Sequence, residues 1–241
     1  KTTGGSVLSS GTMADFDGTD SYIRIDHKPQ YDFFSTTDYS ISVWAQLPST
    51  QSETSSTTNT LVSKRGTHKD YGQDKKLKHV LRRRNILTPQ YPFNIEVLNQ
   101  TAAMADRGKV SISLSNGITT VEAISTTTIN DTEAHHICFN KVGKTLELWI
   151  DGVKESTDEL PTSGSNEVIT LRGISNKNDI VLGSRTLTDG FVEDVVSSHT
   201  TLSGSLDELR IYNKSLSTNE IKSLANNDYI TGSAYQTDIV G

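Results

Sequence analysis

The sequence predicts an all-β fold of two antiparallel sheets packed face to face, closed by one short helix near the C-terminus. Three observations support this prediction. Apolar and polar residues alternate over many short segments, which is typical of half-buried strands. Turn dipeptides such as Asn116-Gly117 and Asp151-Gly152 separate these segments. Roughly ten to fourteen strands are expected, which suits a two-sheet sandwich better than one open sheet.

The predicted strands begin with residues 38–47, where the alternation is regular. Ile41 and Val43 fall on one face, and Ser42 and Trp44 fall on the other. Asn116-Gly117 favours positive φ, so residues 109–125 are expected to form a hairpin. Further strands are predicted within residues 93–97, 135–153, 178–184 and 203–212.

The only well-signalled helix follows Leu216. Ser217 is the expected N-cap and Glu220 lies three residues later, the spacing of a capping box. Leu216 is placed to pack against Ile221, and Ile221 with Leu224 forms a single apolar edge. The helix is therefore expected to lie on a sheet.

Composition limits the class of protein. The chain has 241 residues, a net charge of −6 and one cysteine, Cys138, so no intrachain disulfide can form and the fold depends on packing. No apolar run is long enough to span a membrane, so membrane insertion is not expected. The chain opens with Lys1 and no signal-peptide pattern. It is therefore interpreted as a mature product or a piece of a longer multidomain or assembled protein.

A single domain over residues 1–241 is predicted, interrupted by two polar segments. Residues 48–60 are low in complexity and are interpreted as a loop between strands. Residues 64–90 form a basic excursion: between Leu61 and Gln90 the sequence holds nine Lys or Arg and two Asp. Strands of similar character lie on both sides of each segment, which argues against a domain boundary.

The strand, turn and capped helix of "GSLDELRIYNKSLSTNEIKSLA" resemble the laminin G-like and pentraxin-like branch of the concanavalin A-like sandwiches. "FDGTDSYIRI", "LVSKRG", "HHICFNKVGKTLELWIDG" and "DIVLGS" extend the resemblance over most of the chain. It implies a jelly-roll sandwich with a closing helix. In pentraxins the position matching Cys138 forms a disulfide with a cysteine matching Trp44, so the chain is closer to the general laminin G-like group, and pentameric assembly is not expected.

The resemblance also implies a calcium site. Asp189, Glu193 and Asp194 fall where the pentraxin pattern places its acidic calcium loop, and Asp70 falls where it places other ligands. Hard cations take several oxygen ligands from adjacent loops. The alternative is that these carboxylates are solvated loop residues, and the basic neighbours Lys75 and Lys76 oppose a cation.

Two further groups are candidate ligand-binding residues. Trp44 and Trp149 both alternate away from the main core face and could stack on a sugar ring; the favoured alternative is a second small core under loops or the C-terminal helix. The second group consists of basic residues and one tyrosine in segment 64–90: Tyr71, Lys75, Lys76, Arg82, Arg83 and Arg84. These residues could hold an acidic glycan or an acidic protein, or they could belong to a solvated loop.

A non-enzymatic recognition domain is the predicted function. The sequence lacks the tight Glu-x-Asp-x-x-Glu cluster of glycoside hydrolases of this fold, and it lacks hydrolase, metalloprotease and phosphate-loop motifs. The expected partner is a glycan or glycoprotein on a cell or host surface, with Ca²⁺ as the only candidate cofactor and no nucleic acid. The expected location is extracellular, cell-surface or virion-associated. The alternative is a structural or protein–protein module, such as a virion decoration, a tail-associated domain or an accessory domain.

Overall fold

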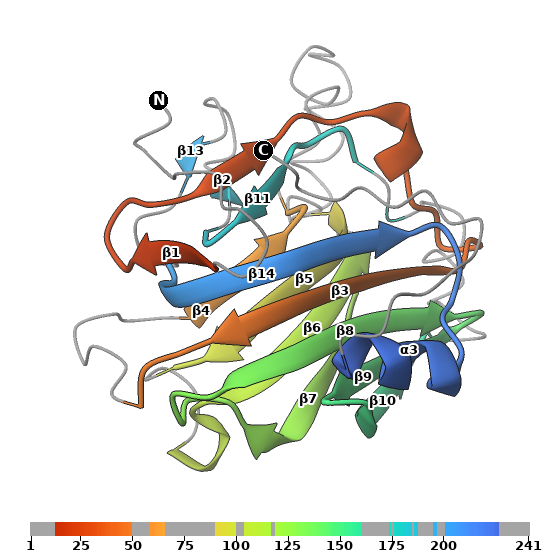
Figure 1. The fold of residues 1–241 in the computed structure, drawn as a ribbon. Helices are drawn as coiled ribbons and strands as arrows, with labels where there is room; N and C mark the ends of the chain where they lie inside the picture. Colours follow the sequence, from red (N-terminus) through yellow and green to blue (C-terminus); the bar gives the residue numbers. More distant parts are fainter. Residues whose placement is uncertain are drawn as a thin grey trace.

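In the residues that it describes, the computed structural model contains two stacked six-stranded antiparallel sheets and one α-helix (Figure 1). The residues that it describes are 13–49, 58–65, 90–99, 104–116, 119–160, 174, 176–184, 186–187, 195–196 and 201–226. Within them lie fourteen strands, so the prediction of an all-β sandwich with a C-terminal helix is confirmed.

Sheet A has six strands in the order β1-β14-β3-β8-β9-β10. In that order they are Ala14–Asp17, Ser203–Tyr212, Tyr39–Gln46, Ala134–Val142, Thr145–Ile150 and Val153–Glu159. The first and last strands in sequence thus pair at one edge of the sheet, with Ala14 opposite Leu206. This pairing brings the two ends of the described chain into one sheet.

Sheet B also has six strands, in the order β2-β11-β4-β5-β6-β7. In that order they are Ile23–Ile25, Ile180–Leu182, Thr58–Ser63, Gln90–Leu98, Lys109–Asn116 and Thr120–Thr128. A separate pair joins β12 (Thr186–Leu187) and β13 (Val195–Val196), and single 3₁₀ turns, η1 and η3, lie at Pro29–Tyr31 and Met104–Asp106. The predicted hairpin is confirmed, since β6 pairs with β7.

The boundaries of the two predicted polar segments differ from the structure. β4 begins at Thr58, inside the segment expected to be a loop to residue 60, because Thr58 and Thr60 pair with Leu98 and Glu96. Gln90, the expected end of the basic excursion, is already the first residue of β5. The intervening residues 66–89 lie outside the described part of the chain.

The main core fills the space between the sheets and is rich in aromatic rings. Tyr39 is fully buried and stacks on Phe139, with ring centroids 5.6 Å apart. Its hydroxyl donates to the carbonyl of Pro92, so a strand of sheet A is bonded to the chain of sheet B. Phe93 packs edge-on against Phe139 at 6.4 Å. Such offset and edge-to-face pairs are the favoured aromatic geometries.

Helix α3 (Thr218–Ala225) packs on the outer face of sheet A beside β8 (Figure 1). The capping box is present: Ser217 Oγ accepts from Glu220 N at 3.4 Å, and a Glu220 carboxylate oxygen accepts from Ser217 N at 2.8 Å. The apolar side of the helix and the residues beneath and before it form a second core cluster of Cys138, Trp149, Tyr212, Leu216, Ile221 and Leu224. The predicted helix, cap and apolar edge are confirmed.

The register of β3 and β8 corrects one expectation. Ser42 lies opposite Cys138, and Trp44 lies opposite His136, so the residue facing Cys138 is not Trp44. Burial raises the pKa of the Cys138 thiol, and the residue is fully buried in the second core. Cys138 therefore serves as a small apolar core residue.

Candidate functional site

The predicted site residues divide into those that the structure describes and those that it does not. All four predicted calcium ligands, Asp70, Asp189, Glu193 and Asp194, lie outside the described residues. The same holds for Tyr71, Lys75, Lys76, Arg82, Arg83 and Arg84. Within the described residues, no group of three His, Cys, Asp or Glu side chains is suited to hold a metal ion. Only Trp44 and Trp149 can be placed.

Trp149 is a core residue. It is 5% exposed and belongs to the cluster beneath α3. Its indole N–H donates to Glu147 at 3.0 Å, and the Lys154 ammonium lies over its ring, 5.2 Å from the centroid. Trp149 is therefore not available as a stacking surface. It belongs to a second small core under the C-terminal helix, which is the alternative favoured from the sequence.

The outer face of sheet B offers little open surface along β4, β5 and β6. Its outward side chains are polar, but Thr60, Asn94 and Ser111 are each at most 3% exposed. Thr60 bonds Glu96 at 3.3 Å, and Glu96 is 8% exposed. A surface for a partner is therefore better sought on sheet A.

Trp44 is half-buried on the part of sheet A that the α3 cluster leaves free. Its backbone partners are His136 on β8 and Asp207 on β14, and directly opposed residues of an antiparallel pair share one face. The Trp44 and His136 rings are tilted, with centroids 5.5 Å apart. We call the surface formed by Trp44, His136, Asp207, Glu208 and Arg210 the Trp44 face.

His136 lies fully buried in the floor of the Trp44 face. Its Nε2 is 2.8 Å from Ser42 Oγ, and its Nδ1 has no hydrogen-bond partner among the described residues. Burial, with a further contribution from Arg210, lowers the pKa of His136 to about 4. The ring is therefore neutral at neutral pH, and its free nitrogen is an unused polar atom beside Trp44.

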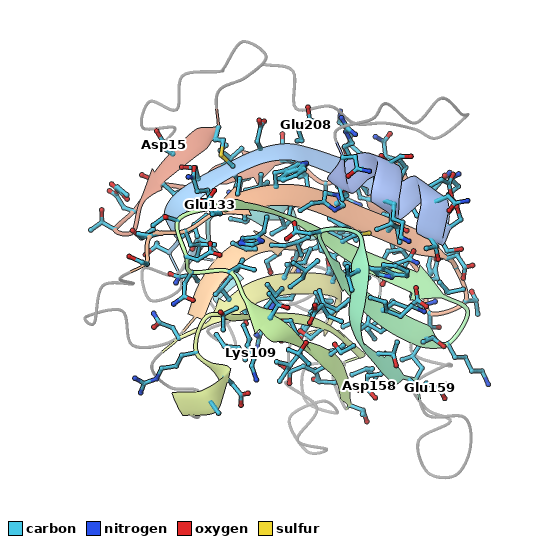
Figure 2. All side chains as sticks on the ribbon, turned by 60° about the horizontal axis from the view of Figure 1, so that its bottom comes forward. Asp15, Lys109, Glu133, Asp158, Glu159 and Glu208 are labelled. Atoms are coloured by element: carbon cyan, nitrogen blue, oxygen red, sulfur yellow. The ribbon has the colours of Figure 1, made fainter. Side chains whose placement is uncertain are left out.

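A β-bulge in β14 shapes the other side of the face. The pairing with β3 shifts between Asp207 and Arg210, and Glu208 takes a positive φ of 51°. Asp207 Oδ1 accepts from Glu208 N at 2.8 Å, and Arg210 forms an ion pair with Glu208. Figure 2 shows Glu208 on the outer side of sheet A near α3. Bulges commonly redirect side chains beside functional sites.

A histidine between two carboxylates borders the Trp44 face. His135 Nδ1 is 2.7 Å from Asp151 Oδ2, and His135 Nε2 is 3.1 Å from Asp131 Oδ1. Asp151 also accepts from His136 N at 2.8 Å. Burial lowers the pKa of His135, but the bonds to Asp151 and Asp131 outweigh burial and raise the pKa above its ordinary value.

The raised pKa of His135 has a defined effect on stability. The folded chain binds the His135 proton more tightly than the unfolded chain does. The stabilisation of the folded state that results from this tighter binding is fully present below the unfolded-state pKa of about 6.5. It is lost as the pH rises through the folded-state pKa, so alkaline pH weakens the link between the turns at Asp131 and Asp151.

Sequence reasoning missed the burial of Lys64. This first residue of the predicted basic excursion is 0% exposed. Its Nζ lies 3.1 Å from His27 Nδ1 and donates to the carbonyl of Asn178. Asn176 in turn donates to the Lys64 carbonyl at 2.8 Å. Lys64 therefore fastens the segments next to β2, β4 and β11, and no local signal in the sequence indicates this.

The fold and the Trp44 face together define a two-sheet antiparallel β-sandwich that carries a partly exposed aromatic side chain among polar groups on one sheet. The chain belongs to the concanavalin A-like lectin/glucanase superfamily, whose laminin G family model matches residues 17–222. No curated protein matches the chain in sequence. No helix in the described ranges is long and apolar enough to cross a membrane.

Several solved structures share the fold. The binding domain of Paraclostridial Mosquitocidal Protein 1 is 18% identical with a TM-score of 0.57, over 89% of this chain and 43% of that one. Domain 4 of AbnA, an extracellular arabinanase of Geobacillus stearothermophilus, is 16% identical with a TM-score of 0.53, over 91% and 79%. A putative carbohydrate binding protein from Bacteroides ovatus is 10% identical with a TM-score of 0.51, over 87% and 46%. The chain thus spans less than half of two of these three.

Proposed function

We propose that this chain is a non-enzymatic carbohydrate-recognition module that binds a sugar on the Trp44 face. The observation that carries the proposal is the half-buried Trp44 ring on the open part of sheet A. No described residue accepts a hydrogen bond from its indole N–H. An aromatic ring with an apolar face and a polar edge is suited to stack on a sugar and bond its hydroxyls.

The neighbours of Trp44 suit this role. Asp207 stands directly opposite on β14, and Gln46 and Glu208 are exposed on either side. A few polar groups around an aromatic platform are the usual composition of a small-molecule site. The comparisons support the class of ligand: the AbnA domain was solved in complex with arabinotriose, and the Bacteroides relative is described as a putative carbohydrate binding protein.

The non-enzymatic role rests on the carboxylates of the face. Glycoside hydrolysis needs one carboxyl as proton donor and a second as base or nucleophile. Glu208 is held in an ion pair with Arg210, and Asp207 accepts a backbone N–H. Both groups thus serve the bulge. The expected result is that no reducing ends are released from any polysaccharide that the chain binds.

The wider setting follows from this function. A module of this kind fits an extracellular, cell-surface or virion-associated protein that attaches to a glycan or glycoprotein, and it fits a chain that is part of a longer protein. Calcium assistance through Asp70, Asp189, Glu193 and Asp194 is part of the proposal. Binding is therefore measured both in calcium and in chelator.

The test is isothermal titration calorimetry of the purified chain with oligosaccharides, including arabinotriose, xylohexaose, cellohexaose and mannohexaose. We expect binding that Trp44→Ala abolishes. The matched control is Phe34→Ala, which removes another exposed aromatic side chain, 49% exposed, near the opposite end of β3. Binding that survives Trp44→Ala would move the site elsewhere. No binding to any glycan would favour the structural or protein–protein module instead.

A further inference from the structure

We infer that the Trp44 face is selective for neutral, hydroxyl-rich glycans and rejects anionic ones. This inference rests on the proposed function and names its ligand class. It differs from the acidic-ligand expectation attached to the basic residues of segment 64–90. It depends on described side chains alone.

The charge near Trp44 is negative. Asp207 lies opposite Trp44, Glu208 follows it in the bulge, and Asp15 lies across the next strand pair, where its Oδ1 accepts from Ser205 Oγ at 2.6 Å. The guanidinium among them belongs to Arg210, which is 8% exposed and paired with Glu208. Figure 2 shows Asp15 and Glu208 on the same outer side of sheet A. Among the described residues of this part of sheet A, three carboxylates therefore accompany one largely buried cation.

The hydrogen-bonding groups of the face also favour a neutral sugar, because they are mainly acceptors. An ionised carboxylate is an acceptor only, with about four lone-pair sites. Asp207 Oδ1 accepts one hydrogen bond from Glu208 N, and Asp15 Oδ1 accepts one from Ser205 Oγ. The Oδ2 atom of each carboxylate can therefore accept a hydrogen bond from a ligand. These groups require a ligand that brings donors, and sugar hydroxyls are donors.

Anionic glycans are unsuited to this face in two ways: their charged groups donate no hydrogen bonds, and they carry the same sign of charge as the face. A sulfate, uronate or sialate group is itself an acceptor only, so it cannot bond the Asp207 or Glu208 carboxylates. Its charge is also repelled by them, and like charges within a few ångströms of a partly desolvated surface interact strongly. A neutral sugar can instead stack on Trp44 while its hydroxyls donate to the carboxylates. Exclusion of anions thus follows from the same groups that hold the neutral ligand.

The experiment compares each neutral hexose oligosaccharide that binds, such as cellohexaose or mannohexaose, with the same molecule oxidised at its C6 primary hydroxyls to uronic acids. Where a pentose oligosaccharide binds instead, a sulfated derivative of that molecule is the anionic probe. The two probes share linkage and ring geometry and differ in charge. We expect the oxidised probe to bind about tenfold or more weakly than the neutral probe at low salt. This difference in affinity, the affinity gap, should narrow near 1 M salt, where the screening length falls to about 3 Å. Asp207→Asn should narrow the gap too, because Asn keeps the acceptor oxygen and removes the charge. Glu208→Gln and Asp15→Asn repeat this test if Asp207→Asn fails to fold.

The outcomes separate this inference from the proposed function. Equal or tighter binding of the oxidised probe, lost in Trp44→Ala, would overturn the neutral selectivity and leave sugar binding at Trp44 intact. A gap that is indifferent to salt and to the three charge variants would also overturn it, since the cause would then be steric. Absence of binding to both probes would remove the proposed function and the inference together.

Discussion

The second core beneath α3 gives a direct test of how the helix is held. Ile221 is fully buried against the outer face of sheet A, in the cluster that contains Trp149 and Leu224. Ile221→Ala removes three buried carbon groups, which costs about 2.4 kcal/mol in transfer free energy at about 0.8 kcal/mol each. The cavity left behind adds to this, so a total loss of about 3–4 kcal/mol in unfolding free energy is expected.

Differential scanning calorimetry and urea unfolding followed by circular dichroism measure this loss. For a domain of this size each kcal/mol shifts Tm by about 2–4 °C, so a decrease of about 6–16 °C is expected. The control is Asn219→Ala, an exposed position on the same helix, which should change stability by less than about 0.5 kcal/mol. A loss below about 1 kcal/mol for Ile221→Ala, or one equal to the control, would show that α3 does not depend on this packing.

Three further predictions follow from the backbone and the charges. Ser217→Ala removes one half of the capping box and should lower the unfolding free energy by about 1 kcal/mol in urea titration; an unchanged midpoint would contradict the role of the cap. Gly183→Ala should cost about 2 kcal/mol or more by the same assay, because φ is 74° and an added Cβ would stand 2.2 Å from the Phe16 ring. His135→Gln should lower Tm more at about pH 5.5 than at about pH 8.5, since the contribution of the raised pKa is lost as pH rises; an equal decrease at both pH values would refute this linkage. The pKa of His27 is lowered by burial and by Lys64, so its contribution to stability changes with pH in the opposite direction to that of His135. Because His27 is present in both the variant and the wild type, this contribution cancels when their Tm values are compared.

Local pattern was enough to predict most of the fold. The alternation in residues 39–46 predicts which side chains enter the core, because neighbouring residues of a strand point to opposite faces. Ile41 and Val43 are accordingly fully buried. The capping box at Ser217 and Glu220 is equally local, since both of its bonds lie within four residues.

The Trp44 face could be predicted only in part. Trp44 was assigned to the outer face by alternation, but the sequence did not show that α3 covers Trp149 and leaves Trp44 free. In "LDELRI" strict alternation would put Asp207 on the same face as Leu209. The bulge between Asp207 and Arg210 changes that parity, so that Leu209 is buried while Asp207 stays outward.

Lys64 shows the second limit of local reasoning. Its position in a basic run predicts a solvated side chain, but its ammonium is buried against His27 and Asn178, which lie 37 and 114 residues away in sequence. A buried cation requires partners from several segments. Such partners come together only when β2, β4 and β11 are paired, so the periodicity and the composition of the sequence do not predict them.

The unequal surroundings of the two tryptophans give the chain a pair of intrinsic fluorescent reporters. Trp149 is enclosed beneath α3 and bonded to Glu147, whereas Trp44 is half-buried beside His136. A soluble quencher should therefore reach the Trp44 indole far more readily than that of Trp149. Emission that a sugar shields from quencher would come from Trp44, and emission that shifts when the helix detaches would come from Trp149. The chain holds no other tryptophan, so ligand binding and helix docking can be followed separately in one sample.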